Sequence, residues 1–225
     1  MTIIAIRRFA TNAEFDAALV ERLERAISSP AASRTALMLS GGRTPLPTYR
    51  ELAVRKPVPA PGLHILFSDD RYVPATSASS NFFQSRSLID ALALPESAVL
   101  RVRTELPLEQ AAADYEERLA ALLSSGVRMG LGLLGLGADG HTASLFNSGN
   151  LAQARGHLAI AVQRPDGLQG ISVTPELLSK FAEPLFLVTG ADKHAIVEEF
   201  LKSDSRLTAR QAIAGCEKAE LWIAA

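Results

Sequence analysis

The sequence predicts an α/β protein built on an open, mostly parallel β-sheet with helices on both faces. Short apolar segments alternate with amphipathic segments along the 225 residues, as is typical of parallel sheets with helical crossovers. Polar, glycine-rich segments directly follow several of the apolar runs, which is where open α/β sheets bind ligands. No internal repeat or low-complexity tract divides the chain, so residues 1–225 are predicted to form one domain.

The first half of the chain alternates between strands and helices. Segment 12–27 places Phe15, Leu19, Leu23 and Ile27 at helical spacing, which indicates one buried face. A proline precedes segment 108–123 and a glycine follows it, and this order is typical of helix ends. The expected strands are 3–6, 36–39 and 63–67, and the expected helices are 12–27, 82–92 and 108–123.

The second half contains the clearest strand, the apolar segment 129–136, which runs directly into a glycine-rich loop. Segment 185–188 is another apolar run, and the glycine at 190 separates it from a helix expected at about 193–202. The remaining expected strands are 157–162, 170–173 and 221–223.

Composition and charge exclude several classes of protein. The chain is 48% hydrophobic with a formal net charge of −1, so no global basic field favours nucleic acid or a membrane surface. The single cysteine, Cys216, excludes an internal disulfide, and no His or Cys spacing is typical of zinc. The N-terminal segment is unlike a signal peptide, and no apolar stretch is long enough to span a bilayer. We therefore expect a soluble cytoplasmic protein that needs no metal or cofactor, with its oligomeric state open between monomer and small homo-oligomer.

The first polar loop lies between strand 36–39 and a helix that begins near Pro45. Its glycines let backbone amides point inward, and a helix N-terminus favours negative charge, which suits a phosphate or a polarised carbonyl. An ordinary strand-to-helix turn needs the same residues, so both interpretations stay open. The loop consists of Ser40, Gly41, Gly42, Arg43 and Thr44.

Two further polar segments follow strands 63–67 and 129–136. Asp69, Asp70 and Arg71 are either a solvated ion-pair cluster or catalytic groups at the end of a strand. His141 lies among glycines, two positions after Asp139, which makes a hydrogen bond between the two side chains plausible. Because the carboxyl ends of parallel strands share one edge, we expect the three polar segments to meet in one cleft.

Three motifs resemble 6-phosphogluconolactonases, within the wider glucosamine-6-phosphate isomerase/deaminase-like group. They are MLSGGRTPLPTY at 38–49, SDDRYVP at 68–74 with Ser80 and Asn81 downstream, and LLGLGADGHTASLF at 133–146. A weaker likeness runs through VTGADK at 188–193. The motifs occur in the family's order and span most of the chain.

The resemblance implies hydrolysis of 6-phospho-D-glucono-1,5-lactone, in the oxidative branch of the pentose phosphate pathway. His141 is then the base that activates water, with Asp139 or Asp69 as the acid that orients it. Arg71 or the amides of a glycine loop stabilise the oxyanion. The expected catalytic residues are His141, Asp69, Arg71 and Asp139. The expected substrate-binding residues are Ser40, Gly41, Gly42, Arg43, Thr44, Asp70, Asn81, Gly137, Gly140, Arg164 and Lys193.

The chain departs from the family pattern at several positions. Arg43 replaces a serine, Asp70 a glutamate and Asn147 a proline. Gly170 stands where the family often carries an arginine. If that arginine binds the substrate phosphate, another residue replaces it here, and the candidates are Arg43, Arg164 and Lys193.

Two alternatives to a lactonase differ from it in the residues that they require. An amino-sugar phosphate isomerase/deaminase continues with Ile-Ala-Phe-Asn-Glu-Pro after the histidine, whereas segment 142–147 here contains no glutamate. A catalytically silent sugar-phosphate sensor would keep the anion site and lose the base. Retention of Asp69, Arg71, Asp139 and His141 together argues against such a sensor.

Overall fold

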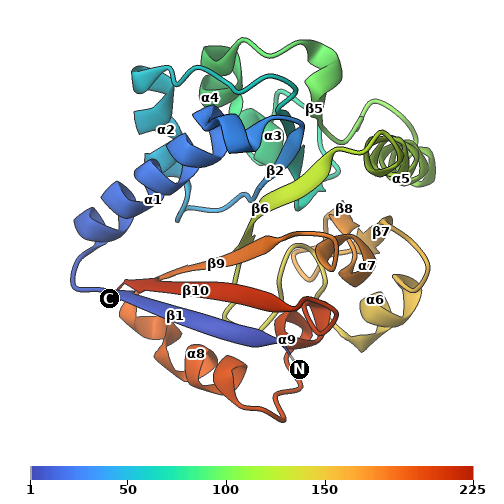
Figure 1. The fold of residues 1–225 in the computed structure, drawn as a ribbon. Coiled ribbons are helices and arrows are strands. Elements are labelled where there is room, and N and C mark those ends of the chain that lie inside the picture. Colours follow the sequence, from blue (N-terminus) through green and yellow to red (C-terminus); the bar gives the residue numbers. More distant parts are fainter. Residues whose placement is uncertain (1, 225) are drawn as a thin grey trace.

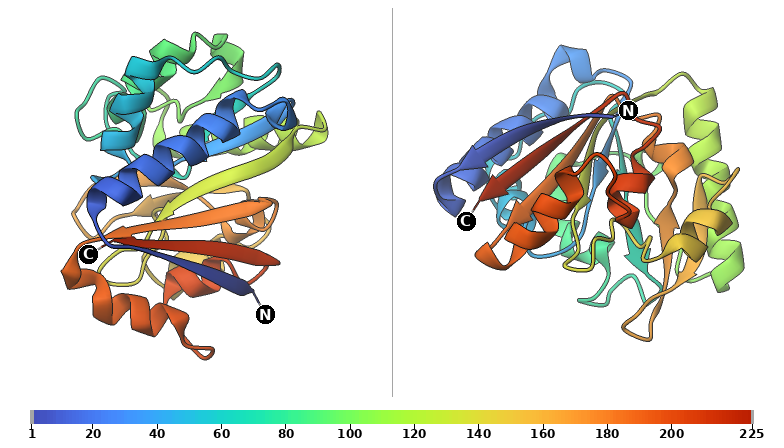
Figure 2. Two further views of the ribbon diagram at one scale, coloured as in Figure 1. Left: turned by 60° about the vertical axis from the view of Figure 1, so that its left-hand side comes forward. Right: turned by 90° about the horizontal axis from the view of Figure 1, so that it is seen from below.

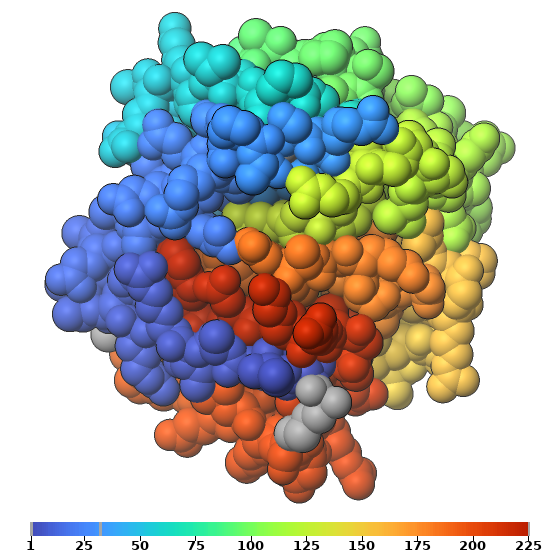
Figure 3. Space-filling view, in the orientation of Figure 1, coloured from blue at the N-terminus to red at the C-terminus, as the bar shows by residue number. Residues whose placement is uncertain are grey.

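The computed structural model describes residues 2–224 and contains a seven-stranded sheet in the order β1-β10-β9-β6-β2-β3-β5 (Figure 1). Every neighbouring pair in this sheet is parallel, which confirms the predicted fold class. Its strands are β1 (Ile3–Phe9), β2 (Thr35–Leu39), β3 (His64–Phe67), β5 (Val99–Leu100), β6 (Arg128–Gly135), β9 (Glu183–Thr189) and β10 (Lys218–Ala224). In the space-filling view (Figure 3) segments from both ends of the sequence lie side by side, because β1 pairs with β10.

Helices cover both faces of the sheet, and Figures 1 and 2 show α1 and α8 on opposite sides. The helix predicted over 82–92 is divided at Ser85 into two, α3 and α4. The helices are α1 (Asn12–Ser28), α2 (Leu46–Arg55), α3 (Asn81–Gln84), α4 (Arg86–Leu92), α5 (Leu108–Ser124), α6 (Ser148–Gln153), α7 (Pro175–Leu178), α8 (His194–Leu201) and α9 (Thr208–Ala212). Short 3₁₀ turns lie at Pro30–Ala32, Glu96–Ala98 and Ala191–Lys193.

Two buried clusters form because successive side chains of a strand point to opposite faces. Leu37 and Leu39 of β2 pack in one cluster with residues of α1, α2 and α4. Met38, between them, packs in the other cluster with residues of α5, α8 and α9. Both faces of β2 are therefore buried, as expected for a parallel strand in the middle of an α/β sheet.

A second, three-stranded antiparallel sheet corrects two of the sequence-based predictions. It consists of β4 (Asp69–Arg71), β8 (Gln169–Val173) and β7 (Ala159–Gln163). The polar segment 69–71, expected as a loop, is thus a strand, and the strands predicted at 157–162 and 170–173 lie outside the parallel sheet. The physical reason is the short hairpin between β7 and β8, closed by the Arg164 amide donating to the Leu168 carbonyl at 2.9 Å, since a tight turn joins strands in antiparallel fashion.

Within residues 2–224, none of the helices is both long enough and apolar enough to cross a membrane.

Candidate active site

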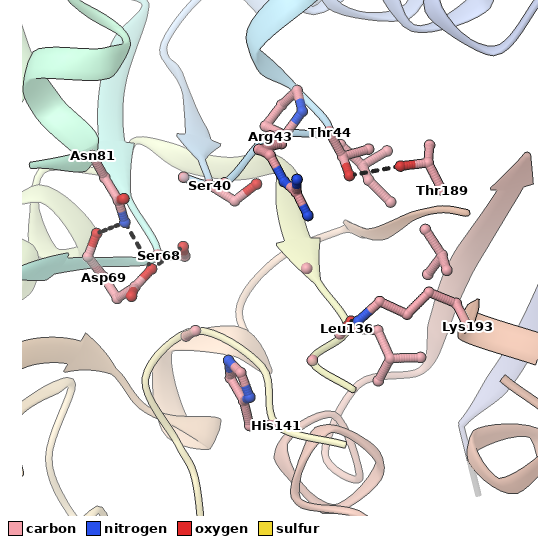
Figure 4. A pocket seen from close by; sticks show the side chains of 18 of the residues that line it. Ser40, Arg43, Thr44, Ser68, Asp69, Asn81, Leu136, His141, Thr189 and Lys193 are labelled. Atoms are coloured by element: carbon pink, nitrogen blue, oxygen red, sulfur yellow. Dashed lines mark hydrogen bonds between the residues drawn. The ribbon is translucent and has the colours of Figure 1, made fainter. Parts of the chain in front are cut away.

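The carboxyl ends of β2, β3, β6 and β9 meet at one edge of the sheet and line a cleft of about 360 Å³ (Figure 4). The three polar segments do converge there, as the strand order predicts. Twelve of the predicted site residues line the cleft: Ser40, Gly41, Gly42, Arg43, Thr44, Asp69, Arg71, Asn81, Gly137, His141, Arg164 and Lys193. Lining residues that the sequence did not single out include Ser68, Leu136, Ala143, Thr189 and Asp192.

His141 is held at the cleft by the loop that follows β6. The Asp139 carboxylate contacts the ring Nδ1 and also accepts a hydrogen bond from the His141 amide at 3.2 Å. The ring packs against Phe146, with 4.5 Å between the ring centroids. A Cβ at Gly137 would lie 2.1 Å from the His141 Nδ1 atom, so this position has to be glycine for the ring to lie here.

The pKa of the Asp139 carboxyl favours its charged form beside the imidazole. Partial burial acts to raise its pKa, but the hydrogen bonds from the His141 ring and amide outweigh that effect and lower the pKa below its ordinary value. Asp139 contacts the His141 ring and is not among the residues that line the cleft, whereas Asp69 forms no hydrogen bond with the ring among the described residues. The sequence left the role of the orienting acid open between Asp139 and Asp69.

Asp69 lies at the base of the cleft and is almost fully buried, with four hydrogen-bond contacts. Its Oδ1 atom accepts from the Ser68 hydroxyl at 2.9 Å and from the Asn81 amide nitrogen at 3.1 Å. Its Oδ2 atom accepts from the Ser144 hydroxyl at 2.7 Å, and its carbonyl accepts from the Asn81 side chain at 2.8 Å. Ser144 was not among the predicted site residues, although it stands three positions after His141 in the third motif.

Asn81 connects Asp69 to Arg71. While its side-chain nitrogen donates to Asp69, its side-chain oxygen accepts from the Arg71 guanidinium, which also donates to the Ser79 carbonyl at 3.2 Å. A Cβ atom at position 41 would lie only 1.9 Å from Oδ1 of Asn81, so the Asn81 side chain occupies the space that a larger residue at Gly41 would need. The first glycine loop and the second motif therefore fit together through one close contact.

The structure does not place Asp70 in the cleft, which corrects its expected role as a substrate-binding residue. Asp70 is buried and accepts hydrogen bonds from the Ser80 hydroxyl and from the amides of Arg71, Asn81 and Phe82. These contacts fix the start of α3. Burial raises the pKa of the Asp70 carboxyl to about 6 despite these hydrogen bonds, and the neighbouring charge of Asp69 adds to the rise.

Gly140 also lies outside the residues that line the cleft. It adopts a φ of 82°, and its carbonyl accepts from the Ala209 amide at 2.9 Å and from the Thr208 hydroxyl at 3.1 Å. It therefore anchors the histidine loop to the start of α9 rather than contacting a ligand. Asn147, which replaces the family's proline, caps α6 by accepting from the Asn150 amide at 3.0 Å.

Two cations that line the cleft come from different loops and are drawn in Figure 4. The Lys193 ammonium donates to the Leu136 carbonyl at 3.1 Å. Among the described residues, neither Arg43 nor Lys193 pairs with a carboxylate. The two loops are joined where the hydroxyls of Thr44 and Thr189 share a hydrogen bond of 3.0 Å. This side of the cleft thus offers two cations that form no ion pair among the described residues, with Asp192 as the carboxylate that also lines it.

Arg164 differs from these two cations. Its guanidinium donates to Asp166 at 2.8 Å and to the Ser144 hydroxyl at 2.8 Å, and it lies 3.8 Å from the Asp69 carboxylate. Its side chain is 10% exposed and lines the cleft, and each of its three nitrogens already donates to a protein oxygen.

Comparison with known proteins gives a consistent result. A family model described as "Glucosamine-6-phosphate isomerases/6-phosphogluconolactonase" matches residues 10–222. The 6-phosphogluconolactonase of Thermotoga maritima is 35% identical over 170 residues, which is 74% of this chain and 74% of the relative. The Homo sapiens 6-phosphogluconolactonase is 32% identical over 207 residues, 86% of this chain and 80% of the relative. The crystal structure of the Thermotoga maritima enzyme superposes with a TM-score of 0.83 at 28% identity, covering 99% of this chain and 100% of that one.

Proposed function

Because the chain belongs to the family of glucosamine-6-phosphate isomerases and 6-phosphogluconolactonases, we propose that it hydrolyses 6-phospho-D-glucono-1,5-lactone with water activated by His141. The observation that carries this proposal is the Asp139–His141 pair at the mouth of a cleft that also holds unpaired cations. Asp139 contacts Nδ1, so the neutral ring keeps its proton there and Nε2 is the basic nitrogen.

The reaction then proceeds in two proton transfers. Nε2 of His141 takes a proton from water while the water oxygen attacks the lactone carbonyl carbon, and the carbonyl oxygen becomes an oxyanion. When the intermediate collapses, the bond from this carbon to the ring oxygen breaks, and His141 returns the proton to that oxygen. General-base help of this kind contributes about 10²–10⁴-fold in rate.

Arg71 is the side chain that we assign to the oxyanion. It lines the cleft, and its Nη1 donates to the Asn81 side chain and the Ser79 carbonyl, which hold the guanidinium in place. Asp69 acts through Asn81, because it fixes which end of the amide faces Arg71. An oxyanion donor is typically worth about 2.7–4 kcal/mol.

We assign the substrate phosphate to Arg43 and Lys193. Both line the cleft and lack an ion-pair partner among the described residues, so neither has to give up a carboxylate to bind an anion. Arg43 also precedes α2, whose N-terminal amides favour negative charge. A guanidinium grips two phosphate oxygens at once, which a lysine does not.

The test is the rate at which the lactone is converted to 6-phosphogluconate, with the spontaneous rate subtracted. Wild-type protein is expected to accelerate hydrolysis, and the His141→Ala variant is expected to do so about 10²–10⁴-fold less. Binding of 6-phosphogluconate without acceleration would instead favour a silent sensor. Release of ammonia from an amino-sugar phosphate would favour the isomerase/deaminase chemistry, for which segment 142–147 supplies no carboxylate.

A further inference from the structure

We propose that Arg164 is a positioning residue that holds the Asp69 carboxylate through the hydroxyl of Ser144, and that Gly170 makes room for it. The proposal rests on the lactone hydrolysis proposed above. It assigns Arg164 a role other than binding the substrate phosphate, for which the sequence made it a candidate.

Each nitrogen of the Arg164 guanidinium already donates to an oxygen of the protein. Nε and Nη2 face the Asp166 carboxylate, with Nη2 at 2.8 Å from Oδ2, while Nη1 donates to the Ser144 hydroxyl at 2.8 Å. The guanidinium also lies over the Phe146 ring, 5.2 Å from its centroid. To bind a phosphate through Nε and Nη2, Arg164 would have to leave Asp166, which already accepts from both nitrogens.

The direction of each hydrogen bond in this chain is determined by its donors. A guanidinium only donates, so the Ser144 oxygen must accept from Arg164. The single hydroxyl proton is then free to point at Oδ2 of Asp69, 2.7 Å away. This arrangement requires that oxygen of Asp69 to be unprotonated. Arg164 thereby holds the Asp69 carboxylate both directly, from 3.8 Å away, and through the hydroxyl that it orients.

From Asp69 the chain of hydrogen bonds continues across the cleft. Asn81 donates to Asp69 and accepts from Arg71, so Arg164, Ser144, Asp69, Asn81 and Arg71 form one connected series. The two ends of this series are the guanidinium groups of Arg164 and Arg71. Loss of Arg164 is therefore expected to make the position of Arg71, which we assign to the oxyanion, less well defined.

Gly170 explains how Arg164 reaches this place. It lies on β8, opposite Val162 of β7, and Arg164 follows the end of β7. A Cβ at position 170 would lie 3.2 Å from Cδ of Arg164 and 3.0 Å from the Asp70 carbonyl oxygen. The Cγ and Cδ atoms of Arg164 thus pack directly over the backbone of Gly170, which has no side chain. A side chain at position 170 would therefore require the stem of Arg164 or the Asp70 carbonyl to move by a few tenths of an ångström.

The experiment compares Arg164→Ala, Arg164→Lys and Ser144→Ala with wild type, and uses Arg86→Ala as the matched control. Arg86 pairs with Asp90 on α4 and does not line the cleft, so its loss removes an arginine ion pair that no member of the series shares. For each variant kcat and KM are measured separately. The affinity for 6-phosphogluconate is measured by calorimetry, which needs no turnover, and folding is followed by thermal unfolding.

If Arg164 is a positioning residue, kcat falls roughly 10- to 100-fold in Arg164→Ala, as expected for loss of hydrogen bonds to a charged group. KM and product affinity stay within about threefold. Ser144→Ala shows a similar loss, and the double variant is little worse than either single one, because both act along the same series. The kcat of Arg164→Lys lies between those of Arg164→Ala and wild type, since one ammonium group cannot donate to Asp166 and Ser144 in the way that the planar guanidinium does.

Gly170→Ala provides an independent arm. Gly170→Ala is expected to lower kcat when Arg164 is present. In the Arg164→Ala background the fall in kcat should be smaller, because the methylene groups of Arg164 that pack against position 170 are absent. An equal fall in kcat in both backgrounds would contradict the proposal that Gly170 makes room for Arg164.

Two results would overturn the assignment of Arg164. A tenfold loss of product affinity with kcat preserved would make Arg164 a phosphate ligand. Unchanged kcat in the folded fraction of Arg164→Lys and Ser144→Ala would make the contacts purely structural. Absence of lactone hydrolysis in wild type would instead reject the proposed function, and the affinity arm would still report whether Arg164 binds the anion.

Discussion

The carboxylate of Asp139 contacts the Nδ1 atom of His141, two residues further along the same loop. The contact leaves Nε2 as the ring nitrogen without a hydrogen-bond partner among residues 2–224. An imidazole held in this way has a defined tautomer and a defined orientation. In the mechanism that we propose, this loop therefore supplies both the base and the acid that orients it, while the cations come from other loops.

The first prediction is that His141→Ala lowers kcat by about 10²–10⁴-fold and leaves the fold intact, because the side chain that takes the proton is lost. Steady-state kinetics with subtraction of the spontaneous rate checks it. Near-wild-type kcat in the variant would remove His141 from the mechanism.

The second prediction concerns Asp139→Asn. The amide keeps the size of the carboxylate but loses its charge, so the ring tautomer and orientation are no longer enforced, and kcat should fall roughly tenfold or more. KM should change little, since Asp139 does not line the cleft. A variant whose KM rises while kcat is kept would show that Asp139 acts on the substrate rather than on His141.

The third prediction is that Asp69→Asn and Arg71→Ala impair turnover more than folding. Arg71 is assigned to the oxyanion, and loss of such a donor typically costs about 2.7–4 kcal/mol of transition-state stabilisation. Comparing kcat with the midpoint of thermal unfolding checks both variants. A large fall in the midpoint with kcat preserved in the folded fraction would return Asp69 and Arg71 to the role of a structural polar cluster.

The fourth prediction concerns recognition of the phosphate by Arg43. Because a charged hydrogen bond is worth roughly 1.5–3 kcal/mol, Arg43→Ser should raise KM for the phosphorylated lactone about tenfold or more. Activity on the unphosphorylated lactone should hardly change. The ratio of kcat/KM for the two lactones is the decisive measurement. If that ratio is the same in wild type and variant, Arg43 does not contact the phosphate.

The fifth prediction concerns stability and Asp70. Burial raises the pKa of Asp70 from 3.8 to about 6 in the folded protein, so the folded state binds more protons than the unfolded state between these values. Stability is fully present below the unfolded pKa and is lost as the pH rises through the folded one. The free energy of unfolding of wild type, relative to Asp70→Asn, should therefore decrease by about 3 kcal/mol on going from acidic to neutral pH.

Chemical denaturation of both proteins at several pH values checks this prediction, and the subtraction removes the titration of all other groups. A difference that grows with pH would mean that the four hydrogen bonds to Asp70 outweigh the effect of its burial.

Much of this protein follows from patterns within single segments of the sequence. The apolar runs at β2, β3, β6 and β9 identified the central strands, since both of their faces are buried. The polar segments that follow three of these strands identified the cleft, because parallel strands bring their carboxyl ends to one edge. Local signals failed for β5, which is only two residues long, and for β7 and β8, whose apolar character does not reveal which sheet they join.

The sequence by itself determined the fold class and the set of loops that form the cleft, because hydrophobic periodicity and glycine positions are local properties. Only the tertiary structure decided what each polar residue does there. Asp69 and Asp70 are adjacent in sequence, yet alternation along β4 turns one toward the cleft and the other toward the start of α3. Arg164 crosses Gly170 because two strands pair, and no local pattern encodes which side chains meet across a hairpin.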